Sequence, residues 1–418
     1  MFESHGLIAR MKQVQPFHIG VVSTFYPNSI EPVRATFVRN LVTAIRRSGV
    51  DVSVVAPVPY APQFLRSEKY RRMRRVPARE KYSGEEITHP RYVVVPKLGG
   101  LSGITYFMGC RTAVADEFQR YGTAVLHAHC AYPDAVGVGM VARQLNIPYV
   151  VTVHGSDINV VARSPLVRAQ IRWALRNASG LIGVSRELCE KMVALVPSRE
   201  KHISHIPCAG VDSSVFSVHE SAVQKKSLNI SQVTKLVLFA GRLVPVKSVD
   251  TLIRAWGQIC TNHEESNSYC LVIVGDGPER TALEKLTSEV GVRDKVRFIG
   301  EVSQEDLAHW LSACSVFCLP SKSEGTPNTI VEALASGRPV VASSVGGIPE
   351  LINSEYVGIL VEPGNVNQLA RGLQAALRRQ WNPRLIAQTV KHLTWETLAI
   401  RNVEAIRNAL KRFGKNAS

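Results

Sequence analysis

Short apolar runs alternate along the chain with longer segments of helical periodicity, and this alternation restricts the possible folds more than any other feature. The series starts near Phe17 and restarts at Lys235, after a polar and irregular stretch. Buried parallel strands connected by crossover helices have this pattern. In the second series we predict strands that include Lys235–Ala240, Tyr269–Val274 and Val316–Leu319.

We therefore predict an α/β protein of two Rossmann-like, doubly wound domains. Residues 1–212 are expected to form the first domain and residues 235–380 the second, with a linker at 213–234. A helical tail at 381–418 is expected to pack back on the first domain. Because open α/β sheets bind ligands beyond the carboxyl ends of their strands, two facing domains would bring their loops into one central cleft.

The composition favours a soluble globular protein, with 45% hydrophobic and 20% charged residues. No apolar stretch approaches the roughly 20 residues that span a bilayer, and the first residues do not have the pattern of a secretory signal. The eight cysteines form no C-x-x-C pair and stand mostly in apolar runs. We expect free thiols in a reducing cytoplasm rather than a disulfide or zinc framework.

The net charge of +16 has its densest cluster between Arg66 and Lys81, where eight basic residues accompany two glutamates and are flanked by Tyr70, Met73 and Tyr82. Such a cluster can contact an anionic membrane surface, where each basic residue contributes about 1 kcal/mol. A solvated surface loop explains it equally well. A nucleic-acid-binding protein would share the charge, but the sequence shows neither interleaved aromatic platforms nor zinc-finger spacing.

The segment Ser323–Leu334 combines a tight loop with a helix start directly after a predicted strand. Thr326 can cap a helix that begins at Pro327, where a missing N–H costs nothing. Free amides at such a helix start, together with the helix dipole, form a site for a phosphate or another oxygen-rich ligand. The amides concerned belong to Asn328, Thr329 and Ile330.

Charged side chains accompany this helix start. Glu324 precedes it and Glu332 lies one turn inside it, so that two carboxylates can accept from ligand hydroxyls, unless they merely follow the preference for acidic residues near a helix start. After another predicted strand, Arg242 and Lys247 stand five positions apart. A guanidinium and an ammonium that converge suit a diphosphate, whereas alone they would be a pair of surface cations.

In the first half, His154 and Asp157 follow a predicted strand in the sequence His-Gly-Ser-Asp. A lone histidine at a strand end is usually structural, but the predicted cleft favours a functional role. His127 and His129 share a strand face, yet no third ligand accompanies them at a suitable spacing. We expect no metal site.

These motifs stand in a recognisable order: Arg242-x4-Lys247, Gly275-Asp-Gly-Pro, and Ser321-x2-Glu-Gly-x-Pro-Asn-x3-Glu-Ala, followed by Gly346-Gly-Ile-Pro-Glu. In this order they resemble the retaining glycosyltransferases of GT-B fold. The chain is most similar to glycosyltransferase family 4, also called glycosyl transferases group 1. The resemblance extends from about Phe17 to Trp395.

The resemblance implies a role for each motif residue. Arg242 and Lys247 would hold the donor diphosphate together with the helix-start amides, and Glu332 would bind the ribose. Glu324 would bind hydroxyls of the donor sugar, and His154, followed by Asp157, would lie beside that sugar. The remaining donor contacts would come from the backbone near Val302 and from Gly325, Thr326, Pro327, Asn328 and Thr329.

The resemblance also implies a reaction. A sugar would move, with retained anomeric configuration, from a nucleotide sugar, most commonly a UDP-sugar, to a glycan or lipid-linked acceptor. The leaving diphosphate would take the acceptor proton, and neither a metal nor a cofactor would be required, because cations and the helix start stabilise the diphosphate. Bacterial surface polysaccharide synthesis, in the cytoplasm or peripherally on the inner face of the cell membrane, is the expected setting, and a small-molecule acceptor is the alternative.

Two features bear on other interpretations and on substrate. A nicotinamide dehydrogenase would share the α/β pattern, but no G-x-G-x-x-G follows the first strand of either half.

Three positions depart from the family: Ala35 stands where glycine is usual, Cys208–Asp212 replaces the common Asn-Gly-Val-Asp, and Thr326 replaces a commoner phenylalanine. Thr326 would make the sugar end of the donor pocket more polar.

Overall fold

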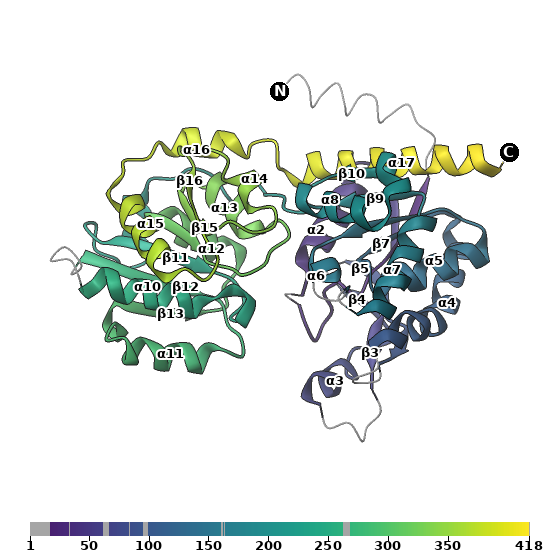
Figure 1. Ribbon diagram of the computed structural model, residues 1–418, viewed down its shortest axis with the longest axis horizontal. Helices are drawn as coiled ribbons and strands as arrows, with labels where there is room; N and C mark the ends of the chain where they lie inside the picture. The colour runs from purple at the N-terminus through teal and green to yellow at the C-terminus, as the bar shows by residue number, and fades with distance from the viewer. Residues whose placement is uncertain are drawn as a thin grey trace. The chain divides into compact units, whose positions relative to one another are not determined.

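In the computed structural model the chain divides into two compact units. Unit 1 comprises residues 1–208 and 395–418, and unit 2 comprises residues 209–394. The structure describes residues 17–417 except 33, 62–66, 83, 95–98, 160, 161, 163 and 262–267. Each unit is a sheet covered by helices (Figure 1).

The main sheet of unit 1 has the strand order β10-β9-β8-β7-β1-β2-β5-β4, in which only β4 and β5 pair antiparallel. Its central strands are buried and mostly apolar because both faces of the sheet are covered, and all five residues of β8 are buried. Strands β3 and β6 form a separate, parallel two-stranded sheet. The strands are β1 (His18–Val22), β2 (Asp51–Val55), β3 (Val58–Tyr60), β4 (Arg79–Tyr82), β5 (Glu85–Thr88), β6 (Arg91–Val93), β7 (Thr123–His129), β8 (Tyr149–Val153), β9 (Gly180–Gly183) and β10 (Ile203–His205).

Helices α4, α5 and α7 pack side by side in unit 1, whereas α17 packs against α2 and strand β9. The C-terminal helix therefore belongs to unit 1, although it follows unit 2 in the sequence. Among the described helices, none combines the length and the apolar character that a membrane span requires. The helices are α2 (Thr36–Arg47), α3 (Glu68–Met73), α4 (Ser102–Tyr121), α5 (Asp134–Leu145), α6 (Ser156–Asn159), α7 (Pro165–Asn177), α8 (Arg186–Leu195) and α17 (Trp395–Ala417).

The sheet of unit 2 has the strand order β13-β12-β11-β14-β15-β16, and every pair is parallel. From β11 the chain builds outward to β13 and then returns to β14 on the other side, so the strand order reverses between β11 and β14. Ligands of doubly wound sheets bind at such a switch point. The strands are β11 (Lys235–Ala240), β12 (Tyr269–Val274), β13 (Val296–Gly300), β14 (Val316–Leu319), β15 (Val340–Ser343) and β16 (Gly358–Val361).

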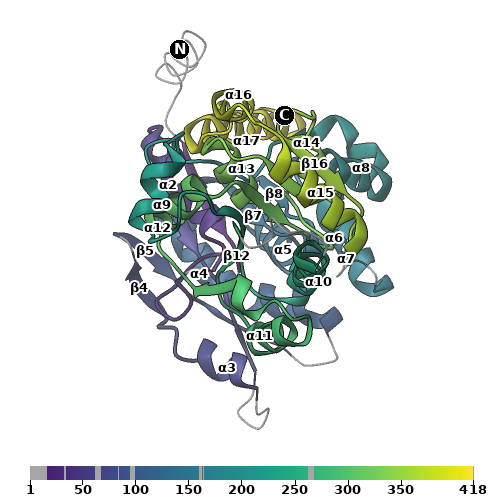
Figure 2. The ribbon, with the colours of Figure 1, turned by 90° about the vertical axis from the view of Figure 1, so that its left-hand side faces the viewer.

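Helices α10, α11 and α15 form one layer on the sheet of unit 2. Figure 2 shows this unit after a turn of 90° from the view of Figure 1. Helix α9 packs against α12, and α16 packs against α13. The helices are α9 (Ser221–Ser227), α10 (Val249–Thr261), α11 (Arg280–Glu289), α12 (Gln304–Ala313), α13 (Asn328–Ala335), α14 (Ile348–Leu351), α15 (Val366–Arg378) and α16 (Pro383–Thr389).

The boundaries of the units differ from those expected from the sequence. Residues 213–234, expected as a linker, belong to unit 2, where the Ser221 hydroxyl donates to the Ala313 carbonyl over 3.0 Å. Residues 381–394, expected as part of the tail, also belong to unit 2, and only the chain from Trp395 onward joins unit 1. Both segments alternate polar residues with a few buried apolar ones, such as Phe216, Ile230 and Ile386, whose packing partners the hydrophobic pattern does not reveal.

Candidate functional site

An ion pair joins the loops on the two sides of the switch point in unit 2. The Lys247 ammonium lies 2.6 Å from Glu324 Oε1, and the Ser321 hydroxyl donates to the same oxygen over 2.6 Å. The Lys247 and Glu324 side chains are 21% and 11% exposed. The structure thus brings together two of the predicted site residues and adds Ser321, for which the sequence predicts no role.

The local sequence fixes Lys247 at this position. It ends a single 3₁₀ turn, Pro245–Lys247, and the buried Ser248 that follows has the left-handed backbone conformation, with φ of 49°. Helix α10 starts at the next residue. The Lys322 amide donates to the Val246 carbonyl over 2.8 Å, so the backbones of the two loops are also directly connected.

Backbone hydrogen bonds also connect the loops after β11, β12 and β13. The Leu243 amide donates to the Asp276 carbonyl over 2.9 Å, and the Gly275 amide donates to the Gly300 carbonyl over 2.7 Å. A Cβ atom at Gly275 would lie 2.1 Å from a neighbouring carbonyl oxygen, so only glycine fits there. These bonds hold the backbone of the exposed Arg242, whose guanidinium has no ion-pair or hydrogen-bond partner among the described residues.

Helix α13 starts one residue later than predicted. It begins at Asn328, and Pro327 occupies the N-cap position with an extended backbone and no side-chain cap, so Thr326 does not cap the helix. The Ile330 amide donates to the Pro327 carbonyl over 3.3 Å, because the cap residue supplies the first acceptor of the helix. Within the described chain, the amides of Asn328 and Thr329 have no acceptor. Two amides, rather than three, are available to an anion.

The second carboxyl group, that of Glu332, is nearly enclosed. Glu332 is 7% exposed and lies on α13, one turn beyond the free amides. Burial raises the pKa of this carboxyl to about 7, because the charged form loses its hydration. Thr326 is similarly enclosed, with 8% of its surface exposed.

A pair of glycines braces the Glu324 loop. The Gly347 amide donates to the Gly325 carbonyl over 2.7 Å. Gly346 has φ of +57°, and a Cβ atom there would lie 2.1 Å from the Glu324 carbonyl oxygen. Gly346 and Gly347 stand in a motif of the sequence, and the structure shows that they support the loop carrying Glu324.

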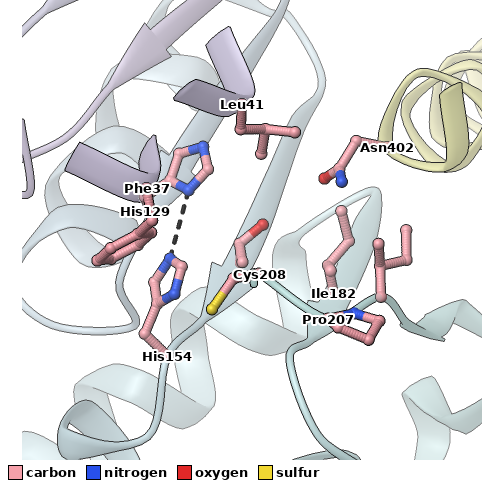
Figure 3. Close-up of a pocket in the computed structure, with 10 residues that line it drawn as sticks. Phe37, Leu41, His129, His154, Ile182, Pro207, Cys208 and Asn402 are labelled. Atoms are coloured by element: carbon pink, nitrogen blue, oxygen red, sulfur yellow. Dashed lines mark hydrogen bonds between the residues drawn. The ribbon is translucent and has the colours of Figure 1, made fainter. Parts of the chain in front are cut away.

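Unit 1 contains a separate cluster of polar groups around His154, which follows β8. The ring nitrogens His154 Nε2 and His129 Nδ1 are 3.3 Å apart, and the two rings are stacked (Figure 3). Burial lowers the pKa of His154 to about 4, so the imidazole is neutral near pH 7. The two rings border a small pocket lined by Phe37, Leu41, His129, Thr152, His154, Ile182, Ile206, Pro207, Cys208 and Asn402.

The Asp157 carboxylate holds the backbone of the His154 loop. The side chain is buried, and its Oδ2 atom accepts from the Ala131 amide over 2.7 Å. Its Oδ1 atom accepts from the amides of Gly155 and Ile158 over 2.8 and 3.1 Å. Backbone amides therefore contact both oxygens of Asp157, which gives this side chain a positioning role, and the donor-binding role expected for it stays a prediction.

A further buried carboxyl lies at the point in unit 1 where the strand order reverses, between β1 and β7. Asp134 Oδ2 accepts from the Thr24 amide over 2.9 Å, and burial raises the Asp134 pKa to about 8. No sequence motif indicates this pair. Nearby in the sequence, Ala35 caps α2 with φ of 46°, a conformation that costs a non-glycine residue about 1–2 kcal/mol.

Two family models match the chain. The model of glycosyl transferases group 1 matches residues 220–392, and that of the glycosyl transferase 4-like domain matches residues 35–208. A relative, described as a putative teichuronic acid biosynthesis glycosyltransferase of Bacillus subtilis, TuaC, is 27% identical over 95% of this chain and 98% of its own.

Solved structures of glycosyltransferases share the fold. Sucrose-phosphate synthase from Thermosynechococcus elongatus has a TM-score of 0.74 at 22% identity, over 94% of this chain and 99% of its own. Anabaena HepE, solved in complex with UDP, has a TM-score of 0.68 at 18% identity over the same shares. Together with the family models, which cover most of both units, these likenesses show that the chain is a glycosyltransferase of GT-B fold and belongs to family 4, the glycosyl transferases group 1.

Proposed function

We propose that this glycosyltransferase transfers a hexose from a UDP-sugar, with retained configuration, to a growing glycan or a lipid-linked acceptor of bacterial surface polysaccharide synthesis. The observation that carries the proposal is the Lys247–Glu324 pair at the switch point of unit 2, beside the start of α13. One relative and one protein of similar fold support it. TuaC is described as a putative teichuronic acid biosynthesis glycosyltransferase, and HepE was solved with UDP.

The proposed diphosphate site consists of cations and amides. The Lys247 ammonium and the unpartnered Arg242 guanidinium would bind the phosphate oxygens, and the free amides of Asn328 and Thr329 would add the positive end of the helix dipole. Charge that develops on the leaving diphosphate is stabilised most by donors already in position. These groups therefore favour departure of UDP, and neither a metal nor a cofactor is proposed.

The bond changes follow from such a site. The bond between the sugar C1 and the diphosphate oxygen breaks while an acceptor oxygen bonds to C1 from the same face, and the acceptor proton passes to the diphosphate. Glu324 is proposed to hold hydroxyls of the donor sugar while its other contact orients Lys247 toward the phosphates. Glu332 is proposed to accept from the ribose, and the backbone at Val302 to meet the base.

His154 is proposed to contact the donor sugar as a hydrogen-bonding group rather than as a general acid. Its neutral imidazole has a free, buried Nδ1 atom, while Nε2 faces His129. A histidine whose pKa lies near 4 carries little charge at neutral pH. A hydrogen bond from this ring can still orient a hydroxyl.

We also propose a cytoplasmic location, supported by eight cysteines that are all free thiols. Contact of residues 66–81 with an anionic membrane is part of this proposal, and Arg66 lies outside the described residues. A small-molecule acceptor is the second candidate, favoured by the structural likeness to an enzyme named sucrose-phosphate synthase.

Thermal unfolding in the presence of a panel of nucleotide sugars tests the donor. The true donor should raise the melting temperature with the logarithm of its concentration. UDP-sugars should do so at lower concentrations than GDP- or ADP-sugars. Glu324→Ala and Lys247→Ala should each lower turnover at least about a hundredfold with little change in melting temperature. Arg254→Ala, at an exposed position of α10, is the control that should keep activity. Full turnover by either site variant would refute the site.

A further inference from the structure

The positive charge of the protein belongs entirely to unit 1. Unit 1 has 32 lysines and arginines against 16 aspartates and glutamates, a net charge of +16, whereas unit 2 has 18 of each, a net charge of zero. A general requirement for solubility would not separate the charge in this way. Unit 1 therefore has a long-range attraction for an anionic partner that unit 2 lacks.

Part of this charge surrounds the short helix α3. Arg71, Arg72 and Arg75 are exposed there. Met73, which the sequence placed among these arginines as an apolar contact, is buried against Val58. Helix α3 thus presents cations but cannot present Met73 to a membrane.

Exposed apolar side chains are found on the neighbouring helix α4 instead. Leu101, Ile104 and Met108 are spaced by three and four residues and therefore share one face. With Val93 of β6 and Leu166 of α7 they form a set that we call the α4 strip. Its members are all 42–65% exposed: Val93, Leu101, Ile104, Met108 and Leu166.

Contacts between β6, α4 and α7 make the α4 strip continuous. The Thr105 hydroxyl donates to the Val93 carbonyl over 2.6 Å, which joins β6 to the first turn of α4. The Gln170 amide donates to the Gly100 carbonyl over 2.7 Å, and a Cβ atom at Gly100 would lie 2.7 Å from Leu166. Strand β6, helix α4 and the start of helix α7 therefore form one surface.

The same strand connects the α4 strip to the cations of α3. The Arg91 guanidinium of β6 donates to the Met73 and Arg74 carbonyls over 2.7 and 3.3 Å. Helices α3 and α4 contact the paired strands β3 and β6, and Figure 1 shows α3, β3 and α4 next to one another. The apolar strip and the arginines of α3 thus belong to the same region of unit 1.

Acidic residues are excluded from the segments that form the strip. The sequence has no aspartate or glutamate from residue 87 to 115 or from 158 to 186. An exposed arginine accompanies the strip instead, because Arg111 follows Met108 by three residues on α4 and shares its face. A nucleic acid would be attracted by the arginines but would have no use for five exposed apolar side chains among them.

We propose that the α4 strip and its arginines dock unit 1 on an anionic phospholipid bilayer, an inference that rests on the proposed function and names the surface used. The apolar side chains enter the boundary between headgroups and acyl chains, and the arginines remain among the phosphates. Stable peripheral binding generally requires two signals, such as apolar insertion together with a basic patch, and this surface supplies both. A lipid-linked acceptor would then be presented directly to unit 1.

Sedimentation of the full chain with vesicles tests the surface. The protein should bind vesicles of phosphatidylcholine with phosphatidylglycerol and should not bind phosphatidylcholine alone. Ile104→Ser combined with Met108→Ser should weaken binding at least about tenfold, and Arg71→Gln combined with Arg72→Gln should weaken it by roughly fivefold for each arginine. Binding of the Ile104/Met108 variant that equals wild type would overturn the proposal, as would a wild-type protein that ignores anionic vesicles.

A matched control excludes a general effect of removing apolar side chains. Val223 and Val233 of unit 2 are 59% and 75% exposed, and their double serine variant should bind vesicles like the wild type. An equal loss in this control would overturn the proposal. Stabilisation by UDP reports on unit 2 alone. If UDP still binds and vesicles do not, the membrane surface is refuted and the proposed function stands. If vesicles bind and UDP does not, the membrane surface stands and the proposed function is refuted.

Discussion

Replacing Glu332 by glutamine should separate the electrostatic cost of this buried carboxyl from its use in donor binding. The Glu332 pKa is about 7 in the folded protein, raised by burial from an ordinary value of 4.5. A carboxyl with a raised folded-state pKa stabilises the fold below its unfolded pKa, and this stability is lost as pH rises through the folded pKa. For Glu332 the loss falls between pH 4.5 and about 7.

The size of the effect follows from the same two values. The difference between 4.5 and about 7 corresponds to about 3 kcal/mol of unfolding free energy above pH 7. Glutamine has nearly the same shape and no charge, so Glu332→Gln should be more stable than wild type by up to about 3 kcal/mol, or roughly 6–12 °C in melting temperature, at pH 8. At pH 4.5 the two proteins should melt together.

The affinity for UDP should change in the opposite direction. If Glu332 accepts a hydrogen bond from the ribose, loss of its charge should weaken UDP binding at pH 8 by about tenfold, since charged hydrogen bonds are about twice as strong as neutral ones. Calorimetric titration with UDP and thermal unfolding at both pH values measure the two effects. Glu355→Gln, at a side chain that is 73% exposed, is the control and should change neither.

Two results would refute this reasoning. A stability difference that is the same at pH 4.5 and pH 8 would show that the charge of Glu332 is not its cause. Unchanged UDP affinity at pH 8 would show that Glu332 has no contact with the nucleotide, even if the stability prediction holds.

Two further substitutions test backbone geometry. Ala35→Gly should stabilise unit 1 by up to about 1 kcal/mol, because glycine removes the strain of φ at 46° and adds less than that in unfolded-chain entropy; a lower unfolding midpoint in urea would contradict this. Gly346→Ala should abolish stabilisation by UDP, since its Cβ would lie 2.1 Å from the Glu324 carbonyl oxygen, whereas Gly364→Ala, at φ of +77° with no atom within 4 Å, should keep it. Similar UDP binding by both alanine variants would exclude a bracing role for Gly346.

The sequence by itself determined the fold class and the position of the donor motifs. The predicted strands Lys235–Ala240, Tyr269–Val274 and Val316–Leu319 coincide with β11, β12 and β14. They could be found because a strand buried on both faces is a continuous apolar run, whatever its neighbours are. The motif loops follow these strands directly, so their placement at the carboxyl ends required no tertiary information.

The tertiary structure decided which of those loops contact one another, which side chains are exposed and which partners each side chain has. Lys247 and Glu324 are far apart in the sequence, and only the strand order places their loops on the two sides of one switch point. The sequence shows Asp157 only as a carboxylate after a strand, and the fold shows that backbone amides donate to both of its oxygens. The α4 strip has a helical period that indicates burial, and only the packing of its neighbours shows that this face is exposed. Local patterns record which residues are apolar, whereas exposure and pairing depend on segments that meet only after folding.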